Sequence, residues 1–494
     1  MKRGKKGLFS RLFDAFSTLG NSEPNFDTTT HRSIRAWNPG SNGPNTTVVY
    51  ALNELRNKSR DLTRKYPYMN GAYKTIVGNI LGGGISVLSR STDLNFRKDI
   101  KELWDEWQEN CDVEGIHNLK ALLGIAIRER YEAGEVFIRH RPCFADDDHP
   151  VPYVIEILEP EFVPHDYNAI LPDGGFIIAG IEFDKNNRRV AYWMYKEHPG
   201  DNLVVRDNTS YVRIPAEEIC HYFSPQRAGQ IRGIPECFSG IVKARDLMIY
   251  DEAELTKKKM SALLAGFITT PADPAETLNA DEDDADADPG EAVAKIEPGM
   301  LMTLEPGEDV RFTAPVESGS SYEPFMKSNH RQMARCIGMT YEEFTGDLSG
   351  VNFSSIRTGL NQSQREYRQE QDRLIRMVLR VIWKNFVKYA VLSGTVDVPA
   401  FVDNQRDYTR ARFQAPGWAY VNPVQEVQAV KEKIKAGLMS RQQAAADMGE
   451  DIEEIDAQLV NDANRAAKNG MVFDIDPTQG KGAPTNDNQA EMPS

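Results

Sequence analysis

The longest regular pattern of apolar and polar positions lies between residues 354 and 394. Apolar side chains recur there mostly at spacings of three, four or seven, which predicts one apolar stripe along a helix. At about 1.5 Å per residue, about 40 residues give a rod of roughly 60 Å. The other side is rich in charged and amide side chains, so the helix is either the spine of a repeated assembly or a long helix within one large domain. The stripe comprises Ile356, Leu360, Tyr367, Leu374, Val378, Ile382, Phe386 and Tyr389.

Residues 339–353, just ahead of this helix, have little apolar periodicity. They include Gly346 and Gly350, so the sequence predicts a mobile loop. Asn352, or one of the serines that follow it, can cap the first turn of the helix.

Two further helices are predicted at residues 236–266 and 321–338. The first follows Pro235 and carries Lys257, Lys258 and Lys259 in its C-terminal third, where cations suit the helix dipole. The second opens with a capping box formed by Ser320 and Glu323. Because the pair brackets residues 267–320, we expect an antiparallel stalk with a protruding tip.

The tip segment, residues 267–320, combines an acidic run with a short β-hairpin. The hairpin is predicted from MLMTL at 300–304 and DVRFTAP at 309–315, with a Pro-Gly turn between them. Self-repulsion should keep the acidic run extended and mobile. Its acids include Asp281, Glu282, Asp283, Asp284, Asp286 and Asp288.

Residues 49–235 read as an α+β domain. Helical periodicity is predicted first, and a period of two takes over after residue 134. Helices are expected at 49–80 with a break near Pro67, at 94–111 and at 119–133; strands are expected at 135–140, 152–158, 175–183, 188–195 and 203–213. We expect Trp104 and Trp107 to pack in the core, and His198 and His221 to have structural roles.

The two ends of the chain have different characters. Residues 395–476 are predicted to be mainly helical, with an irregular crossing and then helices at 423–437 and 440–465, and residues 477–494 form a polar, disordered tail. Residues 1–48 form a basic arm and linker. Five basic residues there accompany an apolar helical face, which indicates packing on protein or nucleic acid, or alternatively on a membrane surface. That face comprises Leu8, Phe9, Leu12, Phe13 and Phe16.

The amino-acid composition limits the classes of function that the protein can have. The 494 residues carry a formal net charge of −15, unlike a tight sequence-reading DNA binder, although a DNA conduit should repel phosphate. Five scattered cysteines form no CxxC pair, and no apolar run approaches membrane-spanning length. Nucleophile-elbow, zinc-protease and phosphate-loop motifs are missing, so we expect no enzyme, cofactor or metal. A hydrolase with dispersed catalytic residues remains an alternative, as does a membrane-associated scaffold that uses the N-terminal helix.

Several stretches, in order along the chain, resemble phage portal proteins of the lambda family. No single stretch is decisive, and their joint order makes the resemblance specific. They are LRNKSRDLTRKYPYMNGAYKTIVGNILGGGI (55–85), GEVFIR (134–139), GIEFDKNNRRVAYW (180–193), HPGD (198–201), RIPAEEICHYFSPQRAGQIRGIP (213–235), IEPGMLMTLEPGEDVRF (296–312) and IGMTYEEFTGDLSGVNFSSIRTG (337–359).

The resemblance implies a portal-type α+β fold and a ring of about twelve subunits at one capsid vertex of a tailed phage. It assigns residues 49–235 to an α/β wing, 236–266 and 321–338 to a helical stem, and 267–320 to the clip. It further assigns 339–353 to a tunnel loop, 354–394 to a long spine helix and 395–476 to a helical crown region.

The resemblance also implies partners and a location. Double-stranded DNA would pass as non-specific cargo during packaging and ejection. The terminase large subunit, a head-completion or connector protein, and the major capsid and scaffold proteins would dock, and no membrane is expected. The protein would reside in the virion, and in the host cytoplasm during assembly.

The resemblance also implies site residues. The clip acids named above would dock the packaging motor or a connector protein, and Lys257, Lys258 and Lys259 are stem channel candidates. The candidate tunnel-loop residues are Thr345, Gly346, Asp347, Leu348, Ser349, Gly350, Val351, Asn352 and Phe353.

Overall fold

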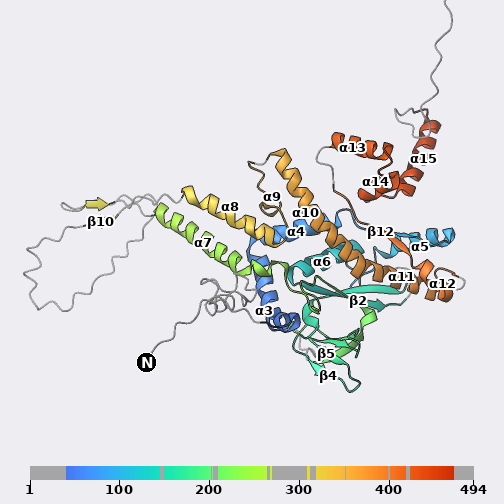
Figure 1. Cartoon of the computed structure of the whole chain (residues 1–494), viewed down its shortest axis with the longest axis horizontal. Coiled ribbons are helices and arrows are strands. Elements are labelled where there is room, and N and C mark those ends of the chain that lie inside the picture. The colour runs from blue at the N-terminus through green and yellow to red at the C-terminus, as the bar shows by residue number, and fades with distance from the viewer. Residues whose placement is uncertain are drawn as a thin grey trace, which may run out of the picture.

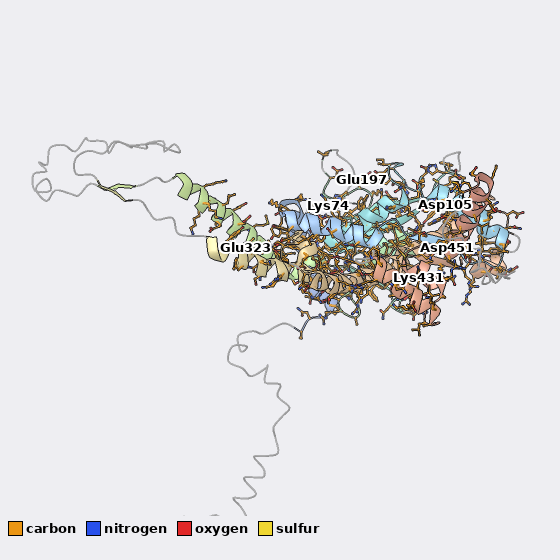
Figure 2. The ribbon with its side chains drawn as sticks, turned by 90° about the horizontal axis from the view of Figure 1, so that it is seen from above. Lys74, Asp105, Glu197, Glu323, Lys431 and Asp451 are labelled. Carbon is orange, nitrogen blue, oxygen red and sulfur yellow. The ribbon has the colours of Figure 1, made fainter. Side chains whose placement is uncertain are left out.

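The protein has a flat body of helices and sheets from which a two-helix stalk projects (Figure 1). Glu323 marks the stalk, whereas Asp105 and Asp451 lie at the far end of the body (Figure 2). The α+β fold class is confirmed. The computed structural model describes residues 41–144, 149–201, 203, 210–263, 267–269, 309–311, 319–350, 352–398, 401–418 and 423–471.

Four helices build the first part of the body. They are α3 (Pro44–Lys65), α4 (Pro67–Leu81), α5 (Leu94–Trp107) and α6 (Leu119–Glu132). The predicted break near Pro67 is confirmed, because each of the first two helices begins with a proline, whose missing N–H costs nothing in a first turn. Asp93 caps α5 and Asn118 caps α6 through their side-chain oxygens.

Antiparallel strands form two main sheets. One has the order β3 (Tyr153–Leu158), β2 (Glu135–Pro142), β9 (Ile219–Phe223). The other is a meander of β4 (Ala169–Ile170), β5 (Phe176–Ile178), β6 (Ile181–Phe183), β7 (Arg189–Tyr195) and β8 (Tyr211–Pro215). Three short 3₁₀ helices, η1 (Pro160–Phe162), η2 (Ala216–Glu218) and η3 (Glu236–Ser239), lie in the connections.

Two strand predictions need correction, and one strand of the three-stranded sheet was not predicted. The strand expected at 175–183 is two strands, because Ala179 and Gly180 take positive φ values of 50° and 76° and turn the chain back. Strand β9 was not predicted, since its five residues are all buried and show no alternation of period two. The strand expected at 203–213 begins only at Tyr211 among the described residues.

The largest core cluster joins this body to the spine helix. Trp107 stacks on Tyr153 at 5.2 Å between ring centroids and donates its indole N–H to the Tyr153 carbonyl over 2.6 Å. Trp104 meets Trp383 and Phe386 of the spine edge to face, at 5.2 and 5.0 Å. Both indoles are buried, so the prediction that they pack in the core is confirmed.

The predicted spine is continuous, but it contains one irregular turn. Helix α10 (Phe353–Leu374) passes through a π-turn, η5 (Ile375–Leu379), into α11 (Arg380–Leu392). The segment ahead of it is not simply a loop, as predicted, because residues Tyr341–Thr345 form the short helix α9. Thr340 and Glu343 close a capping box that stabilises this helix.

The stalk consists of α7 (Ile241–Leu263) and α8 (Gly319–Cys336), so both predicted stalk helices are confirmed as helices. Helix α8 begins one residue before Ser320, so that serine is not the cap that the sequence predicted. At the tip, β10 (Phe267–Thr269) pairs antiparallel with β11 (Asp309–Arg311). The expected partner strand of the predicted hairpin and the acidic run at 281–288 lie outside the described residues, as do the N-terminal arm and the C-terminal tail.

The C-terminal region contributes to the body and then adds three helices beside it. Its first elements are α12 (Phe401–Tyr408) and β12 (Ala411–Gln414), and β12 pairs with β1 (Ser86–Ser89). Helices α13 (Pro423–Lys435), α14 (Arg441–Asp447) and α15 (Ile452–Asn469) follow. One helix was predicted at 440–465, but Gly449, at φ 86°, breaks it where the chain passes Pro416.

Candidate functional site

Aromatic packing holds the two stalk helices together. The Tyr250 ring stacks on Tyr322 at 6.0 Å and meets Phe325 at 5.0 Å between centroids. The Tyr322 hydroxyl donates to Asp251, and the Lys258 ammonium lies 5.4 Å from the centre of the Tyr322 ring. The stalk therefore has a packed seam of its own where it leaves the body.

The base of the stalk is attached to the junction of α3 and α4. His330 of α8 is paired through Nε2 with the Tyr66 hydroxyl at 2.8 Å, and its ring lies 4.5 Å from that of Tyr68. Tyr68 also stacks on Phe344 of α9 at 5.8 Å. Burial lowers the pKa of His330, which favours the neutral imidazole in this aromatic setting. One cluster thus connects the body, the stalk and the start of the predicted tunnel loop.

Glu343 anchors the start of the loop to the spine. Besides capping α9, its carboxylate accepts hydrogen bonds from Ser363 Oγ at 2.6 Å and from the Tyr367 hydroxyl at 3.2 Å, both on α10. Burial, with Glu343 next in effect, raises the pKa of Tyr367, so that hydroxyl remains a donor. Glu343 was not singled out from the sequence, although the Thr-x-x-Glu spacing at 340–343 is a capping-box signal.

The exposed turn of the loop is ordered by Asp347. Its carboxylate accepts from the Tyr341 hydroxyl at 3.0 Å and from the Ser349 backbone N–H at 2.9 Å. The Ser349 hydroxyl and amide hold the pKa of Asp347 below its usual range. Leu348 stays 63% exposed, and Gly346 and Gly350 adopt left-handed φ values of 72° and 74°.

The remaining tunnel-loop candidates are divided between the two flanking helices. Thr345 is the last residue of α9, and Phe353 is the first of α10. Asn352 accepts from the Ser355 backbone N–H at 2.8 Å, which confirms it as the predicted cap. Val351 lies outside the described residues.

A row of cations on α8 lies beside this loop and was not singled out from the sequence. Lys327 and Arg331 lie 5.4 and 5.7 Å from the centre of the Tyr341 ring, and Arg335 pairs with Glu366 of α10 at 3.1 Å. Their spacing of four places them on one helix face, which is the signal that could have found them. Lys327 also lies close enough to Asp347 to favour its ionised form.

The stalk is tied to the spine by a buried ion-pair network. Arg130 of α6 reaches Glu236 of η3 at 2.9 Å and Glu370 of α10 at 3.4 Å, and Arg373 also pairs with Glu370. The Tyr222 hydroxyl donates to Glu370. A cavity of about 370 Å³, lined mostly by polar groups, adjoins these residues. The network places charge at the point where body, stalk and spine meet.

A second buried network lies in the body around Glu135. Its carboxylate is paired with Arg232 at 2.7 Å and Arg56 at 3.1 Å, and it accepts from the Gly233 backbone N–H at 2.7 Å. Burial alone would raise the pKa of Glu135, but Arg232 and His221 hold it below its usual range. Gly233 must be glycine, because a Cβ there would lie 2.1 Å from the Gly134 carbonyl oxygen.

His221 has the structural role that the sequence predicted. Arg189 donates to its Nδ1 at 2.8 Å, so the ring proton is on Nε2, which donates to Glu135 at 2.9 Å. Burial lowers the pKa of His221 to about 4.

Glu159, Glu161 and His198 bring three possible metal-ligand atoms within 4.8 Å of one another. Arg60 already pairs with Glu161 at 2.6 Å and with Glu159 at 3.5 Å, so a cation occupies the neighbourhood of both carboxylates. His198 pairs with Glu159 at 3.0 Å. The arrangement is accounted for by these side chains alone.

The other predicted site residues are the stem lysines and the clip acids. Lys257, Lys258 and Lys259 are exposed in the outer half of α7. The predicted tunnel loop, in contrast, lies beside the base of the stalk. The six clip acids lie outside the described residues. Within the described part of the chain, no helix combines the length and apolarity needed to cross a bilayer.

Curated relatives share most of their length with this chain. The probable portal protein of Halomonas phage phiHAP-1 is 27% identical over 451 residues, covering 89% of this chain and 86% of that protein. The portal protein of Escherichia phage N15 is 20% identical over 481 residues, covering 89% of each. Portal protein B of Escherichia phage lambda is 18% identical over 479 residues, covering 89% of this chain and 88% of that protein.

Among solved structures, a chain in the neck of the native GTA (gene transfer agent) particle computed with C12 symmetry is similar at 13% identity. The match covers 80% of this chain and 93% of that one, with a TM-score of 0.45. The family model described as phage portal protein, lambda family, matches residues 30–371. That span is more than half of the chain and includes most of the body, both stalk helices and the first part of the spine, so the chain belongs to the lambda family of phage portal proteins.

Proposed function

We propose that the protein assembles as a closed ring of about twelve subunits at one capsid vertex of a tailed phage, and that double-stranded DNA passes through the ring during packaging and ejection. The observation that carries the proposal is the family match over most of the body, both stalk helices and the first part of the spine. A single copy also exposes a stalk and a loop at its base, as a ring-forming subunit would. On this proposal the protein resides in the virion, and in the host cytoplasm during assembly.

In the ring, residues 339–353 act as the tunnel loop. Leu348 provides an exposed apolar tip, and Asp347 is engaged in its own turn, so the loop can touch DNA without holding a phosphate. Lys327 and Arg331 supply weak attraction at the stalk base, and Lys257–Lys259 do so farther out on the stem. About twelve copies at −15 give a formal charge near −180, which keeps DNA from binding persistently.

Partner docking follows the same division of the chain. The clip, residues 267–320, receives the terminase large subunit and later a head-completion or connector protein. The wing (49–235) and the crown region (395–476) face the major capsid and scaffold proteins. Catalysis is not part of this proposal, because the curated relatives are named portal proteins. The family membership favours this reading over a hydrolase or a membrane-associated scaffold.

The direct test is the mass of the purified, intact assembly. Native mass spectrometry should give a single closed oligomer of about twelve chains, and negative-stain images should show a ring with a central opening. A stable monomer or dimer under all assembly conditions would contradict the proposal. Hydrolase activity of the purified protein without partners would favour the enzyme alternative instead.

A further inference from the structure

An open groove of about 750 Å³ is lined by residues of α3 and α7. Figure 1 shows these two helices near the point where the stalk leaves the body. Leu62 and Ile241 are buried in its floor, while Val242 and Ile249 on α7 line it and are 73% and 54% exposed. Isolated apolar side chains are common on surfaces, but here two exposed ones share one concave site with a buried apolar floor. The groove is thus a surface that an apolar partner can cover.

We propose that the N-terminal arm of the same chain covers this groove, with Leu8, Phe9, Leu12, Phe13 and Phe16 facing it. Helical spacing places these five side chains on one face, and such a face needs an apolar contact. This contact goes beyond the proposed portal function and does not depend on ring assembly.

The dimensions of arm and groove agree. As a helix, residues 8–16 would span about 12 Å. The groove lining runs from Asn57 to Lys65 on α3, about 12 Å, and from Ile241 to Glu252 on α7, about 16 Å. The length of such a helix, between two and three turns, therefore matches the length of both walls, and amphipathic helices occupy other apolar grooves in this way.

The connection between arm and groove is short. Residues 17–43 link the arm to α3, and a flexible linker of this length has a typical end-to-end distance of about 30 Å. The groove begins about 20 Å along α3 from Pro44. Asn45 pins the start of α3 to the body through the Ile231 backbone N–H at 3.0 Å. Tethering so close to the site gives a high effective concentration, which favours the arm over a separate partner.

The groove lining carries three cations and three carboxylates, but the charges on α7 that have no ion pair among the described residues are mostly acidic, which suits a basic arm. On α3, Lys58 pairs with Glu54 and Lys65 pairs with Asp61 at 2.9 Å. On α7, Arg245, Asp246 and Glu252 form no ion pair with another described residue, and two of these three are carboxylates. The arm carries five basic residues, Lys2, Arg3, Lys5, Lys6 and Arg11. Opposite charges at the rim orient the arm, while the apolar face supplies the contact area.

A photo-crosslinker in place of Phe13 in the full-length protein tests this contact. Mass spectrometry should find crosslinks to peptides containing residues 57–65 or 241–252. Chains labelled with heavy isotopes and carrying the crosslinker are mixed with unlabelled chains before assembly, and both crosslinked peptides should be heavy. Crosslinks from heavy to light peptides would overturn the proposal, because the arm would then bind a second copy. Crosslinks confined to other segments would overturn it as well.

Two matched variants of α7 complete the test. Ile249→Asp puts a charge into the groove, whereas Leu255→Asp changes a side chain of equal exposure, 53%, that does not line the groove. Ile249→Asp replaces an apolar contact with a buried charge. It should therefore reduce the crosslink yield by about tenfold or more, and it should raise the rate of tryptic cleavage after Arg11 by a similar factor. The second should leave both unchanged. Equal effects of the two variants would contradict the proposal. Native mass spectrometry of the same samples reports ring assembly separately, so loss of the ring and loss of the arm contact are distinguishable.

Discussion

The hydroxyl of Tyr341 donates a hydrogen bond to Asp347 over 3.0 Å, which fastens the exposed turn of the predicted tunnel loop to the short helix before it. The Ser349 amide donates to the same carboxylate. The loop is therefore ordered by an acid of its own, at a position where the sequence alone indicated only flexibility.

Replacing Asp347 with alanine should free this turn. Loss of its hydrogen bonds should speed amide hydrogen exchange at Ser349 several-fold, while exchange within α10 stays unchanged. Tyr341→Phe removes only one of these bonds and should have a smaller effect. Unaltered exchange at Ser349 in both variants would show that Asp347 does not order the turn.

Deleting Leu348 to Val351 tests the channel role of the loop. Because the capping box and its contacts to α10 lie before the deletion, rings should still assemble, but packaging or retention of DNA should fall. The measurement is nuclease-protected DNA per particle. As a matched point change, Leu348→Ser should affect packaging more than Ile170→Ser. Both side chains are exposed, but Ile170 lies on β4, outside the predicted tunnel loop. Normal packaging by the deletion variant would count against the channel role.

Neutralising Glu135 should destabilise the body strongly. Glu135→Gln would leave Arg56 and Arg232 buried without their carboxylate, and breaking a buried pair in this way costs about 3–5 kcal/mol. Glu182→Gln is the control. Its partner Arg213 is half exposed to water, so this substitution should lower the free energy of unfolding by less than half as much. Denaturant unfolding followed by tryptophan fluorescence measures both, and equal losses would contradict the assigned role of the Glu135 network.

Two buried histidines should each lower the stability of the body as the pH falls from about 6.5 to about 4. Burial lowers the pKa values of His140 and His221 to about 4, whereas in the unfolded chain both would be near 6.5. In this window the unfolded state binds more protons, so the free energy of unfolding falls as the pH falls. His140→Gln removes one of the two groups and should flatten the dependence in a series of thermal unfolding curves. An unchanged slope would show that His140 does not contribute.

The spine helix could be predicted from the sequence, but its π-turn could not. The regular spacing of apolar residues located the helix, because one buried face is a local pattern. Five buried positions, Leu374, Val378, Ile382, Phe386 and Ala390, are spaced by four. On an ideal helix they would drift by about 160° around the axis, at about 100° per residue. The extra residue of the π-turn at 375–379 reduces that drift to about 60° and keeps the row against the core.

The buried ionic networks could not be predicted in the same way. Glu135 draws its partners from positions 56, 221 and 232, which lie far apart in the sequence, and Arg56 and Arg232 look like ordinary surface residues in their own segments. Glu370 likewise lies in the polar part of the predicted spine, yet it is buried against Arg130 and Tyr222. Such sites depend on how distant segments meet. The capping box at Thr340 and Glu343 is local, and its motif was legible in the sequence.

The acidic run has a proposed role in docking of the packaging motor at the clip. Residues 276–291 contain eight acids and no lysine or arginine. In a ring, copies of this segment would form an acidic collar at the tip of the stalk. Such a collar should steer a basic face of the packaging motor and speed their encounter, and salt should weaken the effect.

Replacing the six acids at 281–288 with serine separates steering from a merely solvated insertion. The association rate of the terminase large subunit is measured across a salt series. At about 0.01 M salt the Debye length is about 30 Å, so steering predicts that the variant associates more slowly than the wild type. Near 1 M salt the Debye length shrinks to about 3 Å, and the association rates of variant and wild type should converge. The dissociation rate should change little, because steering acts on the encounter and not on the docked contact. Identical association rates at every salt concentration would leave the segment as a solvated insertion. A difference that persists at high salt would instead mean that the acids contact the motor directly.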